Sequence, residues 1–217
     1  MNFRDSIWLK PFVRAACPLA VVIFLLLCGG CATSSHKLPL HREMAQLPPG
    51  PVCRVAILPF LNDSDFPQGA EIAKKIFMAE LQRAGDFQIL QEADILRTYQ
   101  QLHIYPGRAP TLEQMKVVAD RVNAQLLVSG IVMEMREDPG QYLTVNPKIV
   151  MEIQIRDGRN GEVLWTAYHR RLGSDYTKTM HFGTIHSIAG LSRQMAIEII
   201  NLWFEKGLSQ CSVLSRP

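Results

Sequence analysis

The side chains best able to take part in covalent chemistry in this sequence are its cysteines, and Cys31 has the most distinctive surroundings. A short apolar run without charged residues, Ala15–Leu27, comes shortly before it. The residues ahead of that run are mainly basic, with Asp5 as the single acid: Arg4, Lys10 and Arg14. A basic head, a short apolar middle and a small-residue exit are typical of a bacterial export signal. We therefore predict that residues 1–30 are a signal peptide.

Cys31, preceded by Gly29 and Gly30, resembles the cysteine of bacterial lipoprotein signals. In that family the sulfur receives a diacylglycerol, the peptide is cut just before the cysteine, and the new amino group is acylated. The leucine that usually stands three places earlier is replaced here by Cys28. Each methylene of a fatty chain that is buried in the bilayer contributes ~0.8 kcal/mol to the free energy of membrane binding. Three acyl chains therefore anchor a protein firmly. The resemblance implies a covalent lipid on Cys31, and we expect no other cofactor.

The residue after the lipidated cysteine indicates to which membrane a lipoprotein is sorted. It is Ala32 rather than aspartate. By resemblance to Gram-negative lipoproteins, this implies the outer membrane, with the chain anchored on the periplasmic face. The alternative is a plain transmembrane helix over Ala15–Ala32, which would stand at the lower limit of the length that spans a bilayer.

Composition limits the remaining classes of function. The 217 residues carry a formal net charge of +3, and most of that excess leaves with the basic signal peptide. A nearly neutral mature chain argues against nucleic acid as a partner, because nucleic-acid binding normally requires a basic face. What remains after residue 30 is long enough for one domain with a substantial core.

Cys53 and Cys211 stay in the mature chain, whereas Cys17 and Cys28 leave with the signal peptide. Two cysteines in an oxidising compartment are able to pair. They stand at the start of the first predicted strand and just after the last predicted helix, which often lie close in a compact domain. The alternative is two unpaired thiols. We keep a Cys53–Cys211 disulfide as a candidate.

The sequence contains no recognisable catalytic motif. It has no nucleophile elbow, no phosphate-binding loop and no HExxH zinc motif. The histidines are scattered, and the nearest pair, His181 and His186, is five residues apart and lies off one helical face. We therefore expect neither a catalytic residue nor a metal site.

Apolar periodicity predicts the elements of the mature chain. Residues 31–51 contain four prolines and no apolar period, which favours a flexible tether. The predicted strands are 52–61, 87–90, 125–133, 148–156 and 163–167. The predicted helices are 68–84, 92–102, 111–122 and 183–204. Residues 52–61 are almost continuously apolar, which indicates a strand buried on both faces of a sheet.

The connections complete the predicted fold. Asp157–Gly161 is a hairpin turn between two alternating strands. Glu134–Pro147 is polar and is predicted to be the longest irregular segment. The order β-α-β-α-α-β-β-β-α predicts one α/β (α+β) domain over 52–206, a mixed sheet flanked by helices, followed by a tail over 207–217.

Three motifs in this order resemble a group of envelope lipoproteins. They are Val55–Phe60 followed by Asn62, the segment Ala124–Gly130, and Asp157–Trp165. The group includes the curli secretion protein CsgG, the polysaccharide export lipoprotein PelC and the penicillin-binding-protein activator LpoB. Their shared domain is like the N-terminal domain of TolB. The resemblance covers roughly residues 52–204, and overall size and tether are most similar to PelC.

The resemblance implies a non-enzymatic assembly protein that supports export or envelope construction. Its partners would be the membrane, envelope or export proteins, and a homo-oligomer. We expect the polar loops 62–69, 134–147 and 172–182 to present contacts. The candidate contact residues are Asp63, Ser64, Tyr142, Asp175, Tyr176, Trp203 and Phe204. An activator of a peptidoglycan synthase, and a periplasmic enzyme or small-ligand carrier, are the alternatives.

Overall fold

The structure is a computed structural model that describes residues 39–48, 50–140, 144–178, 182–209 and 211. The chain divides into two units, Met1–Ser35 and His36–Pro217, and all described residues belong to the second. The predicted signal peptide and Cys31 lie outside the described residues.

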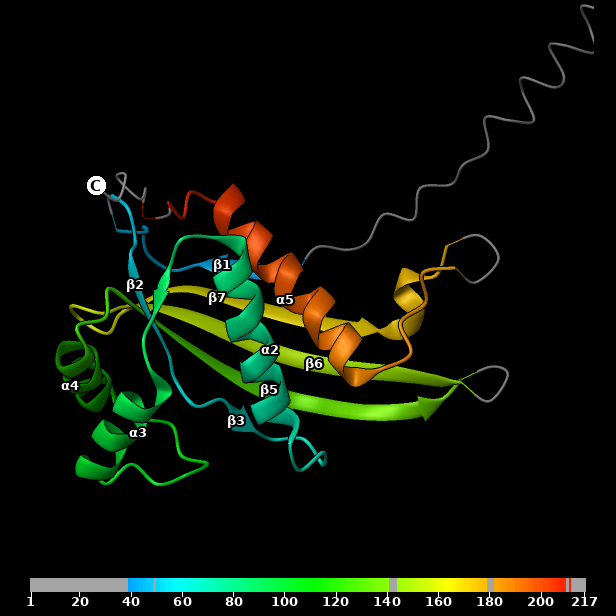
Figure 1. Ribbon diagram of the computed structural model, residues 1–217, viewed down its shortest axis with the longest axis horizontal. Helices are drawn as coiled ribbons and strands as arrows, with labels where there is room; N and C mark the ends of the chain where they lie inside the picture. Colours follow the sequence, from blue (N-terminus) through cyan, green and yellow to red (C-terminus); the bar gives the residue numbers. More distant parts are fainter. Residues whose placement is uncertain (1–38, 49, 141–143, 179–181, 210, 212–217) are drawn as a thin grey trace, which may run out of the picture. The chain divides into compact units, whose positions relative to one another are not determined.

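A single mixed sheet organises the described residues (Figure 1). Its strands are β1 (Leu40–Glu43), β2 (Arg54–Ile57), β3 (Leu61–Asn62), β4 (Gln88–Ile89), β5 (Leu126–Pro139), β6 (Val145–Asp157) and β7 (Val163–Leu172). The order is β1-β7-β6-β5-β2-β4, and β3 pairs with β5 beyond the end of β2. Strand β2 is parallel to β4 and β5, whereas β5, β6, β7 and β1 are successively antiparallel.

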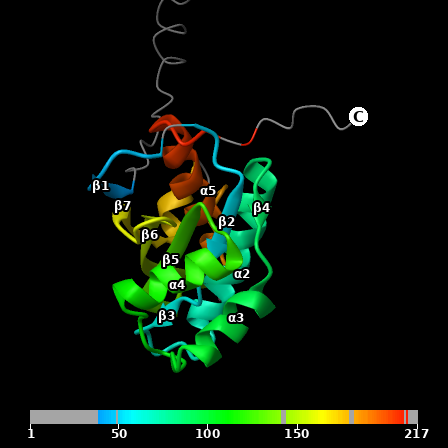
Figure 2. The same cartoon turned by 90° about the vertical axis from the view of Figure 1, so that its left-hand side faces the viewer.

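Helices α2 (Gly69–Ala84) and α5 (Ile188–Glu205) cover one face of this sheet (Figures 1 and 2). Each carries an apolar stripe at helical spacing, and the stripes meet the inward-facing residues of β5, β6 and β7 in the larger core. The ring of Trp203 on α5 contacts the rings of both Phe77 on α2 and Trp165 on β7 there. Apolar burial against this face is the main stabilising contribution to the fold.

Helices α3 (Glu92–Gln101) and α4 (Leu112–Val122) cover the other face of the sheet, at one end only (Figure 2). Val55 and Ile57 of β2 point into the larger core, whereas Ala56 and Leu58 point toward α3 and α4. This confirms the predicted two-sided burial of the first strand. Among the described residues, no helix lies over the rest of β5, β6 and β7 on this side.

Residues 40–43 correct the prediction of a tether that is flexible throughout. They form β1, which pairs antiparallel with Trp165–Tyr168 of β7. The side chain of His41 contacts the ring of Trp165, with ring centroids 5.9 Å apart. A strand this short has little periodicity of its own, and the open edge of β7 provides its hydrogen-bonding partner.

Residues 134–147 correct a second prediction. They form no long irregular segment, because β5 continues to Pro139 and β6 begins at Val145. A bulge between Val132 and Glu134 shifts the alternation of β5, so that Met135 rather than residue 134 points inward. A bulge of this kind hides a strand from a search for strict alternation. The remaining predicted elements are present, so the predicted single mixed α/β domain is confirmed.

Candidate interaction surfaces

Two loops meet at one end of the sheet (Figure 1, right). They are the β5–β6 hairpin and the segment that follows β7, which begins with the 3-10 helix η2 (Gly173–Tyr176). The side-chain oxygen of Asn146 accepts a hydrogen bond from the Ser174 amide at 2.9 Å. His186 Nδ1 lies 3.0 Å from the Val145 carbonyl oxygen. Two of the three loops expected to present contacts therefore form one continuous surface.

A buried polar cluster fastens this loop segment to the domain. The Glu198 carboxylate on α5 lies 2.6 Å from His169 Nε2 and accepts a hydrogen bond of 2.7 Å from the Tyr176 hydroxyl. Arg171 Nη2 lies 3.1 Å from the same carboxylate. These residues come from β7, η2 and α5, so the cluster joins three elements.

Burial and charge determine the protonation of this cluster. Burial alone would raise the pKa of Glu198, but hydrogen bonds from His169 and Tyr176 and the charge of Arg171 lower it to about 2. Burial lowers the pKa of His169, which therefore is neutral and donates from Nε2 to Glu198. Burial, together with Glu198, raises the pKa of Tyr176. Glu198 is thus an ionised carboxylate whose oxygens are occupied by groups of its own chain.

The candidate contact residues in η2 have different environments. Asp175 is exposed, although one of its carboxylate oxygens accepts the Leu172 amide at 2.9 Å. Tyr176 is only 6% exposed and belongs to the Glu198 cluster. The interpretation of Tyr176 as a surface contact is therefore wrong, because its hydroxyl and ring are needed inside the fold.

The loop after β2 is built around hydrogen bonds of its own. Ser64 Oγ donates to the Asn62 side-chain oxygen at 2.7 Å, and the Asn62 amide donates to the Phe66 carbonyl at 2.8 Å. Ser64 is half-buried and shapes the turn before α2, whereas Asp63 is exposed. Asp63 is therefore the more accessible of the two predicted contact residues.

The two aromatic residues at the end of α5, Trp203 and Phe204, also differ in how far they are buried. Trp203 is 2% exposed and lies against Phe77, with ring centroids 5.3 Å apart. The interpretation of Trp203 as a partner contact is wrong, because the larger core encloses its indole. Phe204 is half-buried and stacks on Phe87. Tyr142 lies outside the described residues.

Cys53 and Cys211 are joined by a disulfide, with Cα atoms 4.7 Å apart. Two backbone hydrogen bonds lie beside it, from the Val52 amide to the Ser209 carbonyl at 2.9 Å and from the Cys211 amide to the Val52 carbonyl at 3.1 Å. The segment after α5 is thereby fixed beside the start of β2. This arrangement closes almost the whole domain into one covalent loop.

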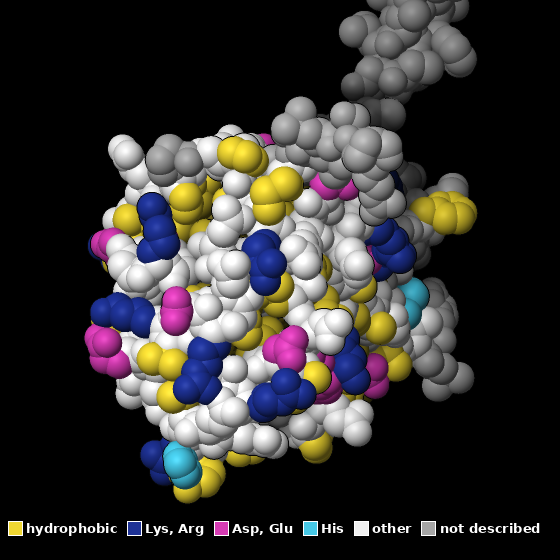
Figure 3. Space-filling view, turned by 60° about the vertical axis from the view of Figure 1, so that its left-hand side comes forward, with side chains coloured by type: hydrophobic (Ala, Val, Ile, Leu, Met, Phe, Trp, Pro, Cys, Tyr) yellow, Lys and Arg dark blue, Asp and Glu magenta, His cyan; other side chains and the backbone are white. Residues whose placement is uncertain are grey.

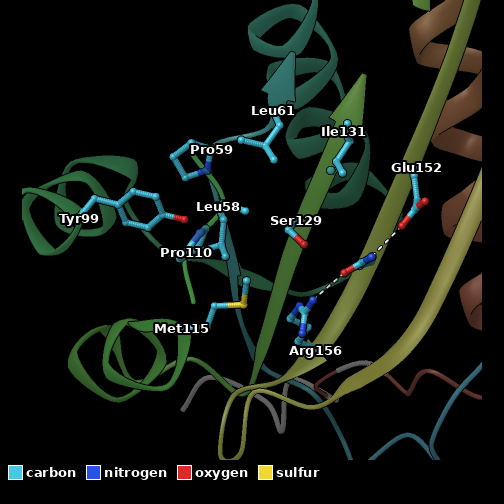
Figure 4. Close-up of a pocket in the computed structure, with 13 residues that line it drawn as sticks. Leu58, Pro59, Leu61, Tyr99, Pro110, Met115, Ser129, Ile131, Glu152 and Arg156 are labelled. Atoms are coloured by element: carbon cyan, nitrogen blue, oxygen red, sulfur yellow. Dashed lines mark hydrogen bonds between the residues drawn. The ribbon is translucent and has the colours of Figure 1, made fainter. Parts of the chain in front are cut away.

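A cavity of about 210 Å³ lies where α3 and α4 meet the helix-free side of the sheet (Figure 4). Its lining is mostly apolar and includes Leu58, Pro110 and Met115. The Tyr99 hydroxyl and Arg156 Nε on its walls have no hydrogen-bond partner among the described residues. Sites that enclose a small-molecule ligand usually measure ~300 to 1,000 Å³, so this cavity is small for a carrier.

The side of β1 and β7 that no described helix covers was not predicted as an interaction surface from the sequence. Leu40 lies directly opposite Tyr168, and Arg42 lies opposite Thr166. Leu40 is 73% exposed and Tyr168 is 37% exposed. Leu40 is the one apolar residue of β1, so no apolar period in the sequence marks this side.

Charges on the rest of the surface are mixed. In the view of Figure 3, basic and acidic side chains are interspersed and apolar groups are scattered between them. Within the described ranges, no group of three or more histidine, cysteine, aspartate or glutamate side chains could hold a metal ion. No helix in that part of the chain is long and apolar enough to cross a membrane.

The described domain belongs to the class of mixed α/β folds in which helices cover both sides of one open sheet. Within that class it is similar to PelC. The PelC dodecamer from Paraburkholderia phytofirmans matches with 17% identity and a TM-score of 0.50, over 74% of this chain and 96% of that chain. A point variant of the same dodecamer matches with 19% identity, the same TM-score and the same coverage. The chain therefore has a PelC-like fold, as the sequence resemblance implied.

Other comparisons are more distant. Lipoprotein GNA1162 from Neisseria meningitidis matches with 17% identity and a TM-score of 0.47, over 70% of this chain and 99% of that chain. No protein-family model and no curated protein matches the sequence.

Proposed function

We propose that this chain is a lipid-anchored, non-enzymatic assembly protein of the bacterial envelope. It is held through Cys31 on the periplasmic face of the outer membrane and supports export or envelope construction. The observation that carries the proposal is the combination of a PelC-like fold with a basic and then apolar segment that directly precedes Gly29, Gly30 and Cys31 in the sequence. Fold alone is a weak guide to function, and this segment supplies the independent second feature.

The buried polar groups support a structural rather than a catalytic role. Glu198 and His169 are of the types that act as general acids and bases. Here they are enclosed between β7, η2 and α5 and bonded to each other. The cluster serves to hold the loop segment after β7 in place, which favours a surface built for contact.

Self-association is the second part of the proposal. PelC from Paraburkholderia phytofirmans was solved as a dodecamer. The surface formed by the β5–β6 hairpin and the segment after β7 presents exposed Asp175 and Phe182, the latter 72% exposed. One exposed aromatic side chain is ordinary on a protein surface, so the proposed contact rests on its position beside two loops that are hydrogen-bonded to each other. We propose that this end of the domain contacts a second copy or an export partner.

The anchor is tested by Cys31→Ser, with Cys28→Ser as the matched control. We expect the wild-type chain and the Cys28→Ser variant to be cut before residue 31, to carry acyl groups and to fractionate with the outer membrane. The Cys31→Ser variant should keep its leader and lack the lipid. Mass spectrometry of the mature N-terminus and membrane fractionation provide the readout. An unchanged mass and membrane fraction for Cys31→Ser would contradict the proposed anchor.

A further inference from the structure

The helix-free side of the sheet edge carries a small patch, which we call the β1–β7 patch: Leu40, Arg42, Tyr168 and Arg170. Residues directly opposite each other in an antiparallel pair share one face, so Leu40 and Tyr168 lie side by side. Arg42 and Arg170 follow at alternate positions on the same face. The intervening His41 faces the other way, toward Trp165 of the core.

The side chains of the β1–β7 patch are of a kind that suits a membrane surface. Tyrosine combines an apolar ring with a polar end, and arginine combines an apolar stem with a charged end, so both fit the boundary between lipid headgroups and acyl chains. Among the described residues, neither Arg42 nor Arg170 forms an ion pair. Two acids lie near the patch in register: Glu152, opposite Tyr168, and Glu134, whose strand partner Val150 lies opposite Arg170. Glu152 accepts a hydrogen bond from Gln154 at 2.7 Å. Glu134 forms ion pairs with Arg136 and Lys148, and the charge of Arg170 also helps to lower its pKa.

The length of chain before β1 limits how far the patch lies from the acyl anchor. Only residues 32–39 separate Cys31 from Leu40, which at full extension span about 30 Å. A free tether to residue 51 would reach roughly twice as far. The pairing of β1 with β7 therefore keeps this particular edge of the sheet close to the lipid.

We propose that the β1–β7 patch rests on the phospholipid surface to which Cys31 is anchored. This inference rests on the lipid anchor of the proposed function. Leu40 and Tyr168 enter the boundary between headgroups and acyl chains, and the two arginines contact lipid phosphates. The patch is too small to attach the domain by itself. The acyl chains supply attachment, and the patch determines which side of the domain faces the membrane.

The test compares Leu40→Trp with Leu96→Trp in the acylated chain. Leu96 lies on α3, away from β1, and is 40% exposed, so it is a matched control. The native Trp165 and Trp203 are 1% and 2% exposed and provide a constant background. The vesicles contain phosphatidylethanolamine and phosphatidylglycerol, part of it with brominated acyl chains that quench tryptophan on contact. We expect about twofold quenching of the added emission for Leu40→Trp and almost none for Leu96→Trp.

Charge reversal gives a second readout. Arg42→Glu combined with Arg170→Glu should reduce the quenching of Leu40→Trp, whereas Arg108→Glu, on an exposed loop, should leave it unchanged. Equal quenching of both tryptophan variants, or an unquenched Leu40→Trp, would overturn the inference. So would a blue-shifted but unquenched Leu40→Trp, because protein rather than lipid would then cover the patch.

Flotation of the same samples separates the two proposals. A chain that does not float with the vesicles contradicts both the anchor and the patch. A chain that floats while Leu40→Trp remains unquenched contradicts the patch alone.

Discussion

At the scale of single residues, Glu198 is a side chain on which hydrogen bonds from several other residues converge. It is an ionised carboxylate in the fold, and it accepts hydrogen bonds from Arg171 and Tyr176 as well as from His169. Such clusters need every member, because a buried charge without its partner carries the full cost of desolvation. This cluster could not be predicted from the sequence, because its four residues become adjacent only after β7, η2 and α5 have packed.

The Glu198→Gln variant tests this role. The neutral amide removes the negative charge that lies against the buried Arg171 guanidinium, so we expect the free energy of unfolding to fall by about 3 kcal/mol. Glu205→Gln, at the exposed end of the same helix, should change it by less than about 0.5 kcal/mol. Urea unfolding followed by tryptophan fluorescence measures both. Similar effects for the two variants would show that the cluster contributes no special stability.

The same cluster predicts a dependence on pH. The pKa of Glu198 is about 2 in the fold and near 4.5 when the chain is unfolded, so the unfolded state binds the proton more readily. The stability from this ionised carboxylate is therefore present above pH 4.5 and is lost as the pH falls toward 2. The lowered pKa of His169 acts in the same direction, beginning below its ordinary value of 6.5.

Measurement of the free energy of unfolding at several pH values checks the direction of this pH dependence. The difference in free energy of unfolding between the wild-type chain and Glu198→Gln should be largest near neutral pH and should shrink as the pH is lowered. A difference that grows on acidification would mean that Glu198 is protonated in the fold.

At the scale of elements, β1 is a segment whose observed structure differs from its prediction. Its residues were predicted to be part of a tether because they lie among prolines and polar side chains. All four residues of β1 are exposed, so no apolar pattern marks them. What makes them a strand is the free edge of β7, a property of the assembled sheet and not of the local sequence.

Replacement of Leu40–Glu43 by alternating glycine and serine tests whether β1 is paired. We expect faster hydrogen exchange for the amides of Trp165–Tyr168 that point toward β1. The backbone amides that pair β5 with β6 should remain protected from hydrogen exchange. Because β1 buries little surface, the free energy of unfolding should fall by no more than about 1 kcal/mol. Unchanged exchange in β7 would argue that residues 40–43 belong to the tether.

Elements with a strong period were predicted correctly for a physical reason. Ile149, Met151, Ile153 and Ile155 alternate without interruption, and all four are buried in the larger core. The far part of β5 was missed because the bulge near Met133 breaks that alternation. Helix α4 was predicted over 111–122, and its start is determined locally, because Thr111 and Gln114 form a capping box in which each side chain bonds the other's backbone amide.

At the scale of the whole molecule, the disulfide ties the two ends of the domain together. It joins residues 158 positions apart, so its loss frees nearly the entire domain in the unfolded state. We expect Cys211→Ser to lower the free energy of unfolding by about 4 kcal/mol. The wild-type chain should also migrate more slowly on a denaturing gel after reduction, and the variant should show no such shift. A wild-type chain that does not respond to reduction would contradict the pairing.

The candidate site was less predictable than the fold. Asp63 and Asp175 were predicted as contact residues because they lie in polar loops, and both are exposed. Trp203 and Tyr176 were not distinguishable from surface aromatics by sequence, because their burial depends on how α5 and η2 pack. Which side of the sheet remains without helices is also a property of the whole molecule.

The central claim is that the chain acts as an acylated, self-associating envelope protein. Native mass spectrometry of the mature chain, released from membranes in mild detergent, tests it most directly. We expect a homo-oligomer whose subunits begin at Cys31 and carry the mass of attached acyl chains. A monomer whose subunit mass shows no lipid would contradict it.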